Sequence, residues 1–407
     1  MIKSYDLGPL ISYIYKLLLE MQQFNEDEAN KEVPQPIRGN VGYLDKGPRN
    51  VMLDRQNPDI LSPPATDHGT LPNLKFSFSM AHNRLQDGGW ARQVTQRELP
   101  ISTTIAGVNM CLKPGGIREL HWHKEAEWAY MLWGRARISG VDQNGQNFLD
   151  DVGPGDMWNF PAGVPHSIQG LEQGCEFLLV FDSGNFSEDS TFLITDWFNC
   201  TPRNILAKNF GVPESHFSNL PTDVDHTRYM FQGEVPGPLS SDKVESPLGD
   251  RKFSYHISDL KPIKTSGGTV RIIDSTIFPA ASTIAVGIVE VEPGGLRELH
   301  WHPNNDEWQY YLEGTARMSV FASEHNARTF DYSQGDVGYV PFAYGHYVEN
   351  TSDTTLRFLE VFRSSQFQDV SLNQWMALIP PELVQQHLEV NDNFIRALRK
   401  QKQPIVK

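Results

Sequence analysis

Two stretches of this chain decide its fold: HWHKEAEW at residues 121–128 and HWHPNNDEW at residues 300–308. In each of them two histidines flank a tryptophan, and a glutamate precedes a second tryptophan. Side chains two residues apart on a β-strand point to the same face of the sheet. We therefore expect each histidine pair to aim two imidazoles at one point, while Trp122 and Trp301 point to the other face. The repeated pattern indicates that one metal-binding unit occurs twice.

A third histidine follows each stretch at a matching distance, at the end of the segments GDMWNFPAGVPH (155–166) and GDVGYVPFAYGH (335–346). Glu127 and Glu307 are the equivalent carboxylates, because each precedes a tryptophan and stands the same distance before a glycine. Their acidic neighbours Glu125 and Asp306 lack this equivalence. The predicted ligands are three histidines and one glutamate in each half: His121, His123, Glu127 and His166, then His300, His302, Glu307 and His346.

The donor set also predicts the kind of metal. Three imidazoles and one carboxylate leave open positions on an octahedral ion, which a catalytic site needs and a closed structural site lacks. The set contains no thiolate, so manganese or iron is favoured over structural zinc. A lone histidine on a strand is more often an ordinary core or surface residue, but a complete set repeated in register argues against that interpretation.

Short alternating segments between turn signals recur in both halves and predict an all-β fold of antiparallel strands, as a sandwich or a barrel. The segments are 104–112, 127–133, 136–141, 157–160 and 176–181, then 283–291, 307–312, 316–321, 338–340 and 356–362. Each set is followed by a helical segment with a tryptophan, Trp197 or Trp375, and then a proline. Residues 221–251 have the composition of a linker. We expect an N-terminal helix and extended arm over 1–55, and domains at 56–232 and 233–407.

The formal net charge of −15 argues against nucleic acid as a partner, because neutralising phosphates requires a basic face. Three cysteines cannot form a disulfide framework, so we expect buried free thiols. The weakly apolar stretch at residues 7–19 is interrupted by charges and predicts an amphipathic helix rather than a signal peptide or membrane span. We therefore expect a cytoplasmic protein, with secretion as the alternative.

Two arginines stand near the predicted ligands. Arg118 and Arg297 each precede the first histidine of their set by three residues. On a continuous strand this odd separation places them on the face opposite the histidines, although the preceding glycine pairs at 115–116 and 294–295 can redirect them. Two roles stay open: a salt-bridged structural residue, or a bidentate clamp for a small carboxylate.

The repeat fails in one informative place, after the matched segments 177–181 and 358–362. The first half there has the loop DSGNFSEDST at residues 182–191, whereas the second half is three residues shorter between Phe362 and Trp375 than the first is between Phe181 and Trp197. The only glutamate of the longer loop is Glu188. Small polar residues around one acid suit a mobile lid that presents a proton donor. An ordinary solvated loop is the alternative.

These motifs resemble the bicupin oxalate decarboxylases, and the resemblance runs from about residue 34 to the C-terminus. It includes IRG at 37–39, DRQNPD at 54–59, residues 118–130 and residues 337–350. The first 30 residues do not match it. The resemblance implies two tandem cupin domains, each a double-stranded β-helix or jelly-roll barrel, with small helical segments after each barrel.

The resemblance also implies roles for individual residues. Manganese would be held by both ligand sets, two ions per chain, with dioxygen as redox cofactor. Arg118 would anchor oxalate and Glu188 would be the lid acid, while Arg297 and Glu360 match positions of the second site. Asp189 stands where the family has asparagine, and its charge should raise the pKa of Glu188. Phe367 stands where a tyrosine is common, so the first domain is the expected catalytic one.

The implied reaction converts oxalate and a proton to formate and carbon dioxide. The first alternative is oxalate oxidase, which yields carbon dioxide and hydrogen peroxide from the same kind of metal site. The second is a non-catalytic, seed-storage-like bicupin, a class that typically loses the ligands. The family's quaternary habit implies a homohexamer built from two trimers.

Overall fold

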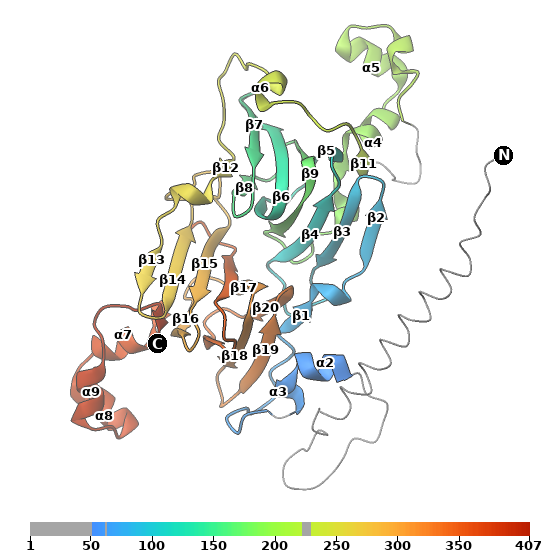
Figure 1. Ribbon diagram of the computed structural model, residues 1–407. Coiled ribbons are helices and arrows are strands. Elements are labelled where there is room, and N and C mark those ends of the chain that lie inside the picture. Colours follow the sequence, from blue (N-terminus) through green and yellow to red (C-terminus); the bar gives the residue numbers. More distant parts are fainter. Residues whose placement is uncertain (1–50, 62, 222–228) are drawn as a thin grey trace, which may run out of the picture.

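The computed structural model of the protein describes residues 51–61, 63–221 and 229–407. Within this part of the chain, antiparallel strands form three sheets and the helices are short. Figure 1 shows two β-domains packed against each other, the first in blue to green and the second in yellow to red. The predicted all-β fold, with small helices after each domain, is confirmed. The helix and most of the arm predicted for residues 1–55 lie outside the described residues.

One sheet belongs mainly to the first domain and two belong mainly to the second. The first domain contains β2 (Asn83–Gln86), β3 (Gly89–Val94), β4 (Ala106–Leu112), β5 (Gly116–Trp122), β6 (Glu127–Val141), β7 (Asn147–Val152), β8 (Met157–Phe160), β9 (His166–Phe181), β10 (Phe192–Leu193), β11 (Met230–Gln232) and β12 (Ser254–Tyr255). One sheet of the second domain has the order β1 (Lys75–Ser77), β20 (Asp336–Val340), β17 (Glu307–Glu313), β22 (Leu356–Phe362), β15 (Ala285–Val291), β14 (Gly268–Ile273) and β13 (Ile263–Thr265). The other contains β19 (Ala327–Ser333), β18 (Thr315–Phe321), β21 (Gly345–Asn350), β16 (Leu296–Trp301), β23 (Val370–Ser371) and β24 (Ile405–Val406).

The two domains share one strand pattern, but a strand that is continuous in the first domain is divided into two in the second. In the first domain, β6 runs for 15 residues and its register against β9 shifts at Gly134, which has a φ of +71°. In the second domain, the equivalent Gly314 has a φ of +81° and separates β17 from β18, which lie in different sheets. Glycine reaches positive φ at little cost. The same residue therefore allows a bend in one domain and a break in the other.

Hydrogen bonding crosses the domain boundary predicted at residue 233. Strand β1 pairs with β20 of the second domain, with Phe76 opposite Val337. Strand β12 pairs with β8 of the first domain, with Ser254 opposite Trp158. Each domain is thus completed by a strand that precedes the other, because the chain crosses over before it enters each repeat. The domain boundaries remain a prediction from the sequence repeat. In the structure, each domain contributes one strand to a sheet of the other.

Asp306, a spectator acid in the predicted ligand region, fastens the two domains together. Its Oδ2 accepts hydrogen bonds from the hydroxyls of Tyr339 at 2.6 Å and Thr104 at 2.9 Å. The backbone N–H of Phe342 donates to its other oxygen at 2.7 Å. Both oxygens of Asp306 are therefore used in structural hydrogen bonds. This agrees with the prediction that Asp306 is not a metal ligand.

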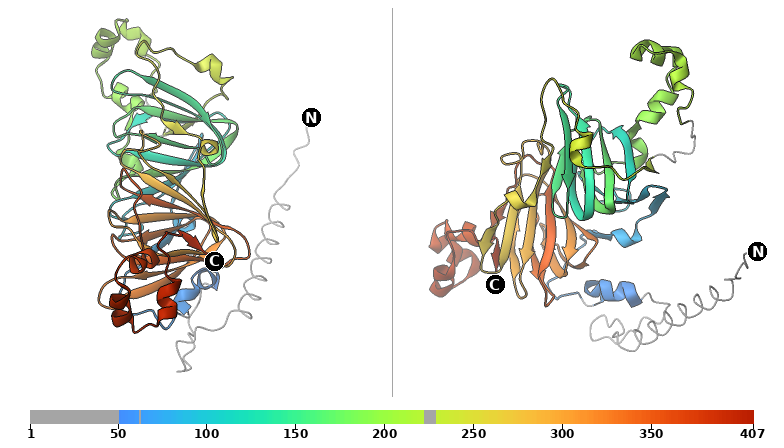
Figure 2. Two further views of the ribbon diagram at one scale, coloured as in Figure 1. Left: turned by 90° about the vertical axis from the view of Figure 1, so that its left-hand side faces the viewer. Right: turned by 45° about the horizontal axis from the view of Figure 1, so that its top comes forward.

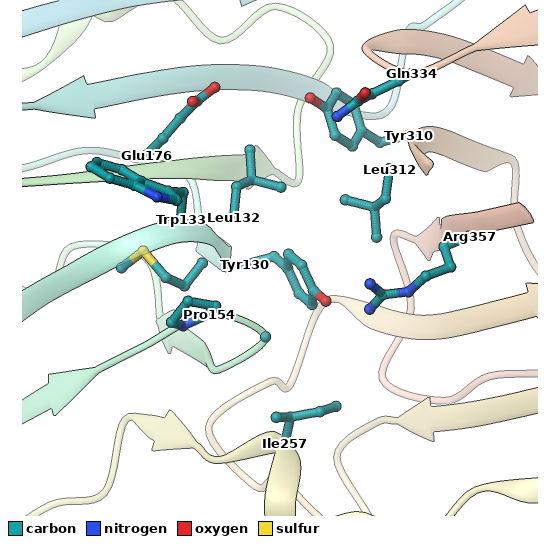
Figure 3. Close-up of a pocket in the computed structure, with 12 residues that line it drawn as sticks. Tyr130, Leu132, Trp133, Pro154, Glu176, Ile257, Tyr310, Leu312, Gln334 and Arg357 are labelled. Carbon is teal, nitrogen blue, oxygen red and sulfur yellow. The ribbon is translucent and has the colours of Figure 1, made fainter. Parts of the chain in front are cut away.

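A cavity lies between the domains and is separate from the predicted site residues (Figure 3). Tyr130 and Tyr310 stand at equivalent positions of the repeat and line it together. Glu176 and Arg357 are equivalent as well, each directly before the matched segment, and they carry opposite charges. Equivalent positions of the two repeats therefore line this cavity from both sides.

The helices lie around the sheets, and the larger clusters occupy opposite ends of the molecule (Figures 1 and 2). Gly211, with a φ of +68°, ends α5, and Ser371 caps α7 by accepting from the Gln374 N–H. The α-helices are α2 (Val51–Gln56), α3 (Pro58–Leu61), α4 (Ile194–Asn199), α5 (Arg203–Phe210), α6 (Leu239–Asp242), α7 (Leu372–Ala377), α8 (Pro381–Leu388) and α9 (Asp392–Ala397). The 3-10 helices are η2 (Phe78–Met80), η3 (Glu188–Ser190), η4 (Glu214–Phe217) and η5 (Ile257–Asp259). None of the helices in the described ranges has the length and apolarity needed to cross a membrane.

The cysteines differ from the expectation of three buried thiols. All three are free, but only Cys175 is buried, while Cys111 is partly exposed and Cys200 is exposed. Cys200 directly follows α4 on the outer helical segment, where the core of the sheets does not reach it.

Candidate active site

Cross-strand register brings the predicted ligands of each half together. His121 lies opposite His166 in the pairing of β5 with β9, and His300 lies opposite His346 in the second domain. The remaining histidine follows the end of β5 or β16, and the glutamate begins β6 or β17. Within each group the ligand atoms are buried and lie within 4.8 Å of one another: His121, His123, Glu127 and His166, then His300, His302, Glu307 and His346.

Backbone hydrogen bonds orient the imidazole rings. Nδ1 of His121 lies 2.5 Å from the Glu119 carbonyl oxygen, and Nδ1 of His166 lies 2.8 Å from that of Val164. A carbonyl oxygen can only accept, so Nδ1 carries the proton and Nε2 keeps its lone pair. The other rings follow the same rule: His123 to Glu125, His300 to Glu298, His302 to Gln368 and His346 to Tyr344.

Several atoms that face the centre of each group are buried and have no hydrogen-bond partner among the described residues. They are Nε2 of His166, His300, His302 and His346, and Oε2 of Glu307. Native proteins rarely leave buried polar atoms unpaired. A cation coordinated by these lone pairs would satisfy them, so the residues fit a divalent metal in both halves.

The protonation states of two residues in the first group also suit metal binding. Burial would raise the pKa of Glu127, but the imidazoles of His166 and His123 hold it well below its usual range. Burial, followed by the charge of Arg118, places the pKa of His121 well below its usual value. The carboxylate is therefore charged and this imidazole neutral at pH 7, the forms in which both residues ligate metals.

The outer oxygen of each glutamate is held by a different residue in the two halves. Oε1 of Glu127 accepts from the Trp158 indole at 3.1 Å, whereas Oε1 of Glu307 accepts from the Gln309 amide at 2.8 Å. Gly338 stands at the position equivalent to Trp158, and a Cβ there would lie 2.6 Å from Oε1 of Gln309. The absence of a side chain at 338 therefore makes room for the glutamine that replaces the indole.

A β-bulge places both arginines on the face of the histidines. Arg118 lies opposite Ile168 and His121 lies opposite His166, so a step of three residues on β5 matches a step of two on β9. Strand β16 has the same irregularity between Arg297 and its first histidine. A bulge adds one residue to a strand and reverses the facing of what precedes it. The redirection thus comes from the bulge rather than from the preceding glycine pairs.

The two buried arginines have different partners. Nε of Arg297 lies 2.9 Å from Glu360, and Nη2 lies 2.7 Å from Asp369. Within residues 51–61, 63–221 and 229–407, no carboxylate forms an ion pair with Arg118. Its guanidinium donates to the Tyr229 carbonyl at 3.2 Å and lies 3.4 Å from the centroid of that ring. The salt-bridged role thus describes Arg297, whereas Arg118 has no directly paired carboxylate among the described residues.

The repeat explains why Arg118 lacks a carboxylate. Glu360 occupies the position that is Leu179 in the first half, within the matched segments. Asp369 occupies the position of Thr191, as the equivalent registers of β23 and β10 show. Leu179 and Thr191 line the cavity that also contains Arg118 and three of the first group's ligands. Two acids that neutralise the second arginine are therefore replaced by an apolar and a neutral residue in the first site.

Glu188 is buried and interacts with Arg118 and Tyr229, two residues that line this cavity. It begins η3 (Glu188–Ser190) and is 6% exposed. Burial raises its pKa, although the charges of Arg84 and Arg118 and a hydrogen bond from Tyr229 lower it. Asp189 adds a smaller rise, in the direction predicted from its charge. A solvated loop does not describe this placement, because the carboxyl group is buried beside the metal ligands' arginine.

Comparison with known proteins agrees with this architecture. The model of the Cupin family matches residues 76–216 and 255–396. The chain is 58% identical to oxalate decarboxylase OxdC of Bacillus subtilis over 93% of its length and 98% of that protein. The chain belongs to the bicupin oxalate decarboxylase family. A probable oxalate decarboxylase of Arthroderma benhamiae is 43% identical over 91% of this chain and 93% of its own. A structure of the Bacillus subtilis oxalate decarboxylase at pH 4.6 has a TM-score of 0.89 and covers 92% of this chain and 98% of its own.

In this bicupin oxalate decarboxylase fold, the second site differs from the first by more than its ion pairs. Phe367 packs edge-on against His302, with ring centroids 5.9 Å apart, so no hydroxyl stands there. The roles predicted for Arg297 and Glu360 in catalysis remain predictions, and the structure shows the two residues bound to each other.

Three residues near the sites escaped the sequence reasoning. Tyr229 contacts Arg118 from within the predicted linker, Arg84 contacts the lid from β2, and Asp369 pairs with Arg297. None belongs to a repeated motif, so only the fold reveals them. Asp369 alone had a signal, since it lies in the shortened loop that replaces the lid.

Proposed function

We propose that this protein is a manganese-dependent oxalate decarboxylase that converts oxalate and one proton to formate and carbon dioxide at its first metal site. The oxalate dianion resists heterolysis of its carbon–carbon bond, because the electron pair would remain on a carboxyl carbon without a sink. Solved structures of the Bacillus subtilis relative are described with Mn(II) centres. When bound, manganese together with dioxygen would supply the one-electron chemistry that makes loss of carbon dioxide feasible.

The ligands on this chain would be the eight residues of the two groups. His121, His123, Glu127 and His166 would hold the catalytic ion, and His300, His302, Glu307 and His346 would hold the second. Each set supplies four donors and leaves room for a small oxygen ligand on an octahedral ion. The proposed content is therefore two manganese ions per chain.

The observation that carries the proposal is the buried guanidinium of Arg118, which lies in the cavity of the first ligand set and forms no ion pair among the described residues. Arg118 is 2% exposed and forms no ion pair within the described ranges, while its guanidinium donates to the Tyr229 carbonyl and lies over the Tyr229 ring. A buried charge without a partner is costly. A carboxylate of oxalate would accept two parallel hydrogen bonds from this planar fork and remove that cost. The second site offers no such vacancy, because Glu360 and Asp369 already neutralise Arg297.

Glu188 would deliver the proton that becomes the C–H of formate. Its buried position favours the neutral acid, which a proton donor must be. The lid also excludes water, since Phe186 stacks on Phe181 at 3.5 Å between centroids and lines the same cavity. With Glu188 in place, the one-carbon radical that remains after loss of carbon dioxide would take up the Glu188 proton together with the electron removed at the start, which gives formate.

The two alternatives have less support. An oxalate oxidase needs no proton donor at the site, whereas Glu188 is buried and interacts with Arg118. The relatives at 58% and 43% identity are named oxalate decarboxylase and probable oxalate decarboxylase. A storage-type bicupin needs no ligands, whereas both groups converge within 4.8 Å.

One assay tests the function. Purified protein loaded with manganese is given oxalate, and formate, hydrogen peroxide and metal content are measured together. We expect nearly one formate for each oxalate consumed. Peroxide as the main product would move the protein to the oxidase class, and neither product would leave a binding protein.

We also propose a homohexamer built from two trimers. Equivalent apolar side chains are exposed in both halves: Leu120 (51%) with Leu299 (48%), and Trp197 (63%) with Trp375 (52%). Repeated exposure of this kind supports contact between the first domain of one copy and the second domain of another. Light scattering checks it, and a fully active stable monomer would contradict it.

A cytoplasmic location is the remaining proposal, supported by three cysteines that form no disulfide. Cell fractionation with activity outside the cytoplasmic fraction would contradict it.

A further inference from the structure

Arg84 lies outside the catalytic group but contacts two consecutive residues of the lid. It belongs to β2, and its Nε lies 3.4 Å from Oε2 of Glu188. Its Nη2 forms an ion pair with Asp189. The side chain of Glu188 is 5% exposed, whereas that of Asp189 is 77% exposed. One guanidinium therefore joins the inner and the outer acid of the lid.

The lid backbone separates these two acids. In η3 the side chain of Ser187 accepts from the Asp189 N–H, and the N–H of Glu188 points to Oε1 of Gln93 at 3.4 Å. Residues that are neighbours in a helical turn point in different directions. Glu188 is therefore buried while Asp189 stays at the surface, and Arg84 lies where both can reach it.

Tyr229 connects Arg84 to the substrate arginine. Its ring lies 4.6 Å from Cζ of Arg84 and 3.4 Å from Cζ of Arg118, measured to the ring centroid. Cations interact favourably with the face of an aromatic ring. Tyr229 also lowers the pKa of the Glu188 carboxyl. The groups around the lid acid are thus two arginines, one tyrosine and Asp189.

We propose that Arg84 and Asp189 form a latch that holds the lid closed while Glu188 is neutral. This inference rests on the proton-donor role proposed for Glu188. A neutral Glu188 loses most of its charge attraction to Arg84, at the stage when it must stay over the substrate. The pair between Arg84 and Asp189 does not depend on that proton, so it keeps the lid in place. Arg84 and Asp189 are positioning residues that act through Glu188.

The test compares variants that remove one or both contacts. Asp189→Asn removes only the outer pair, and since exposed pairs contribute modestly, we expect kcat for formate to fall about two- to fivefold. Arg84→Gln removes both contacts and should lower kcat for formate roughly 10- to 100-fold, because small misplacements of a reacting group are costly. In both variants KM for oxalate should change little and peroxide per oxalate should rise. Arg271→Gln is the matched control, since it removes an ion pair with Glu290 at a similar exposure of 22% and lies in the second domain.

Salt provides a readout that a merely structural role would not move. Salt screens an exposed ion pair, so the peroxide-to-formate ratio of the wild type should rise with sodium chloride. In Asp189→Asn the peroxide-to-formate ratio should be higher at low salt and should rise less as sodium chloride is added. Bound manganese and thermal unfolding are measured in the same samples.

If Arg84→Gln does not fold, Arg84→Lys takes its place, because it keeps one charge. Its peroxide-to-formate ratio should be higher than that of the wild type. The latch alone would be overturned if the wild type makes formate but the variants behave like it. That means an unchanged kcat and an unchanged peroxide-to-formate ratio in Asp189→Asn and in the Arg84 variant. A wild type that makes mainly peroxide would overturn the proposed function itself.

Discussion

Arg297 and Glu360 form a buried ion pair in which Nε and Oε1 are 2.9 Å apart. Asp369 adds a second carboxylate at 2.7 Å from Nη2. Arg118 occupies the equivalent position of the first half, yet contacts the carbonyl and ring of Tyr229 and no carboxylate in the described ranges. One guanidinium is committed to the fold, and the other is available to a dianion.

This asymmetry predicts unequal effects of two matched substitutions. Arg118→Lys should lower kcat/KM for oxalate roughly 10- to 200-fold, because a point ammonium cannot replace a bidentate bond to a charged group. Arg297→Lys should change kcat/KM less than about threefold but lower the melting temperature, because one buried carboxylate loses its partner. Steady-state kinetics and thermal unfolding measure both effects. Equal losses of kcat/KM would place chemistry in both domains.

Removing the lid acid should separate protonation from metal binding. Glu188→Gln should keep two manganese ions and the fold, because Glu188 is no ligand, and should lose formate production by about a hundredfold or more. Peroxide per oxalate consumed should rise, since the oxidised intermediate lacks its proton. Formate, peroxide and metal are measured on one preparation. Unchanged formate output would refute the role of Glu188.

The raised pKa of Glu188 predicts a pH dependence with a definite sign. Burial raises it above its usual 4.5, so the neutral acid persists to higher pH than in an exposed glutamate. Formate production should be high on the acid side and fall as pH rises through the raised pKa. The folded protein also binds this proton more tightly than the unfolded chain. The stabilisation is therefore complete below 4.5 and is lost as pH rises through the folded pKa.

Unfolding measured against pH checks this linkage. The stability of the wild type relative to Glu188→Gln should decrease with rising pH across that window. A constant difference would show that Glu188 has an ordinary pKa in the folded protein.

Each ligand set should hold its own ion. His123→Ala and His302→Ala should each lower bound manganese from about two ions per chain to about one, because loss of one donor from a four-residue set weakens coordination strongly. Only His123→Ala should abolish formate production outright. Elemental analysis and the formate assay distinguish the two. A variant that retained both ions would show that its ligand was misidentified.

The residues behind the glutamates should tune metal affinity in one site at a time. Trp158→Phe removes the hydrogen bond to Glu127 and should weaken the first site by about tenfold or more. Gly338→Ala should disturb Gln309 and weaken only the second site, because the added Cβ would lie 2.6 Å from Oε1 of Gln309. Competition with a chelator measures both affinities. Equal affinities in the wild type and both variants would contradict these supporting roles.

The metal groups could be predicted because their information is local. His121 and His123 share a face through strand alternation, and the repeat selected Glu127 over its acidic neighbour. The strands around them follow from short alternating segments. The bulge between Arg118 and His121 could not be predicted, because it is a property of the pairing between β5 and β9.

The sequence by itself determined the duplicated all-β architecture, the two groups of three histidines and one glutamate, and the longer loop that contains Glu188. Each of these depends on spacing within one strand, one loop or one repeat. Only the tertiary structure decided which arginine is free. Arg297 meets Glu360 and Asp369 across 63 and 72 residues of chain, and Arg118 meets Tyr229 across 111. Charge compensation in a buried site depends on which distant side chains approach, and that is a consequence of the packing of the whole domain.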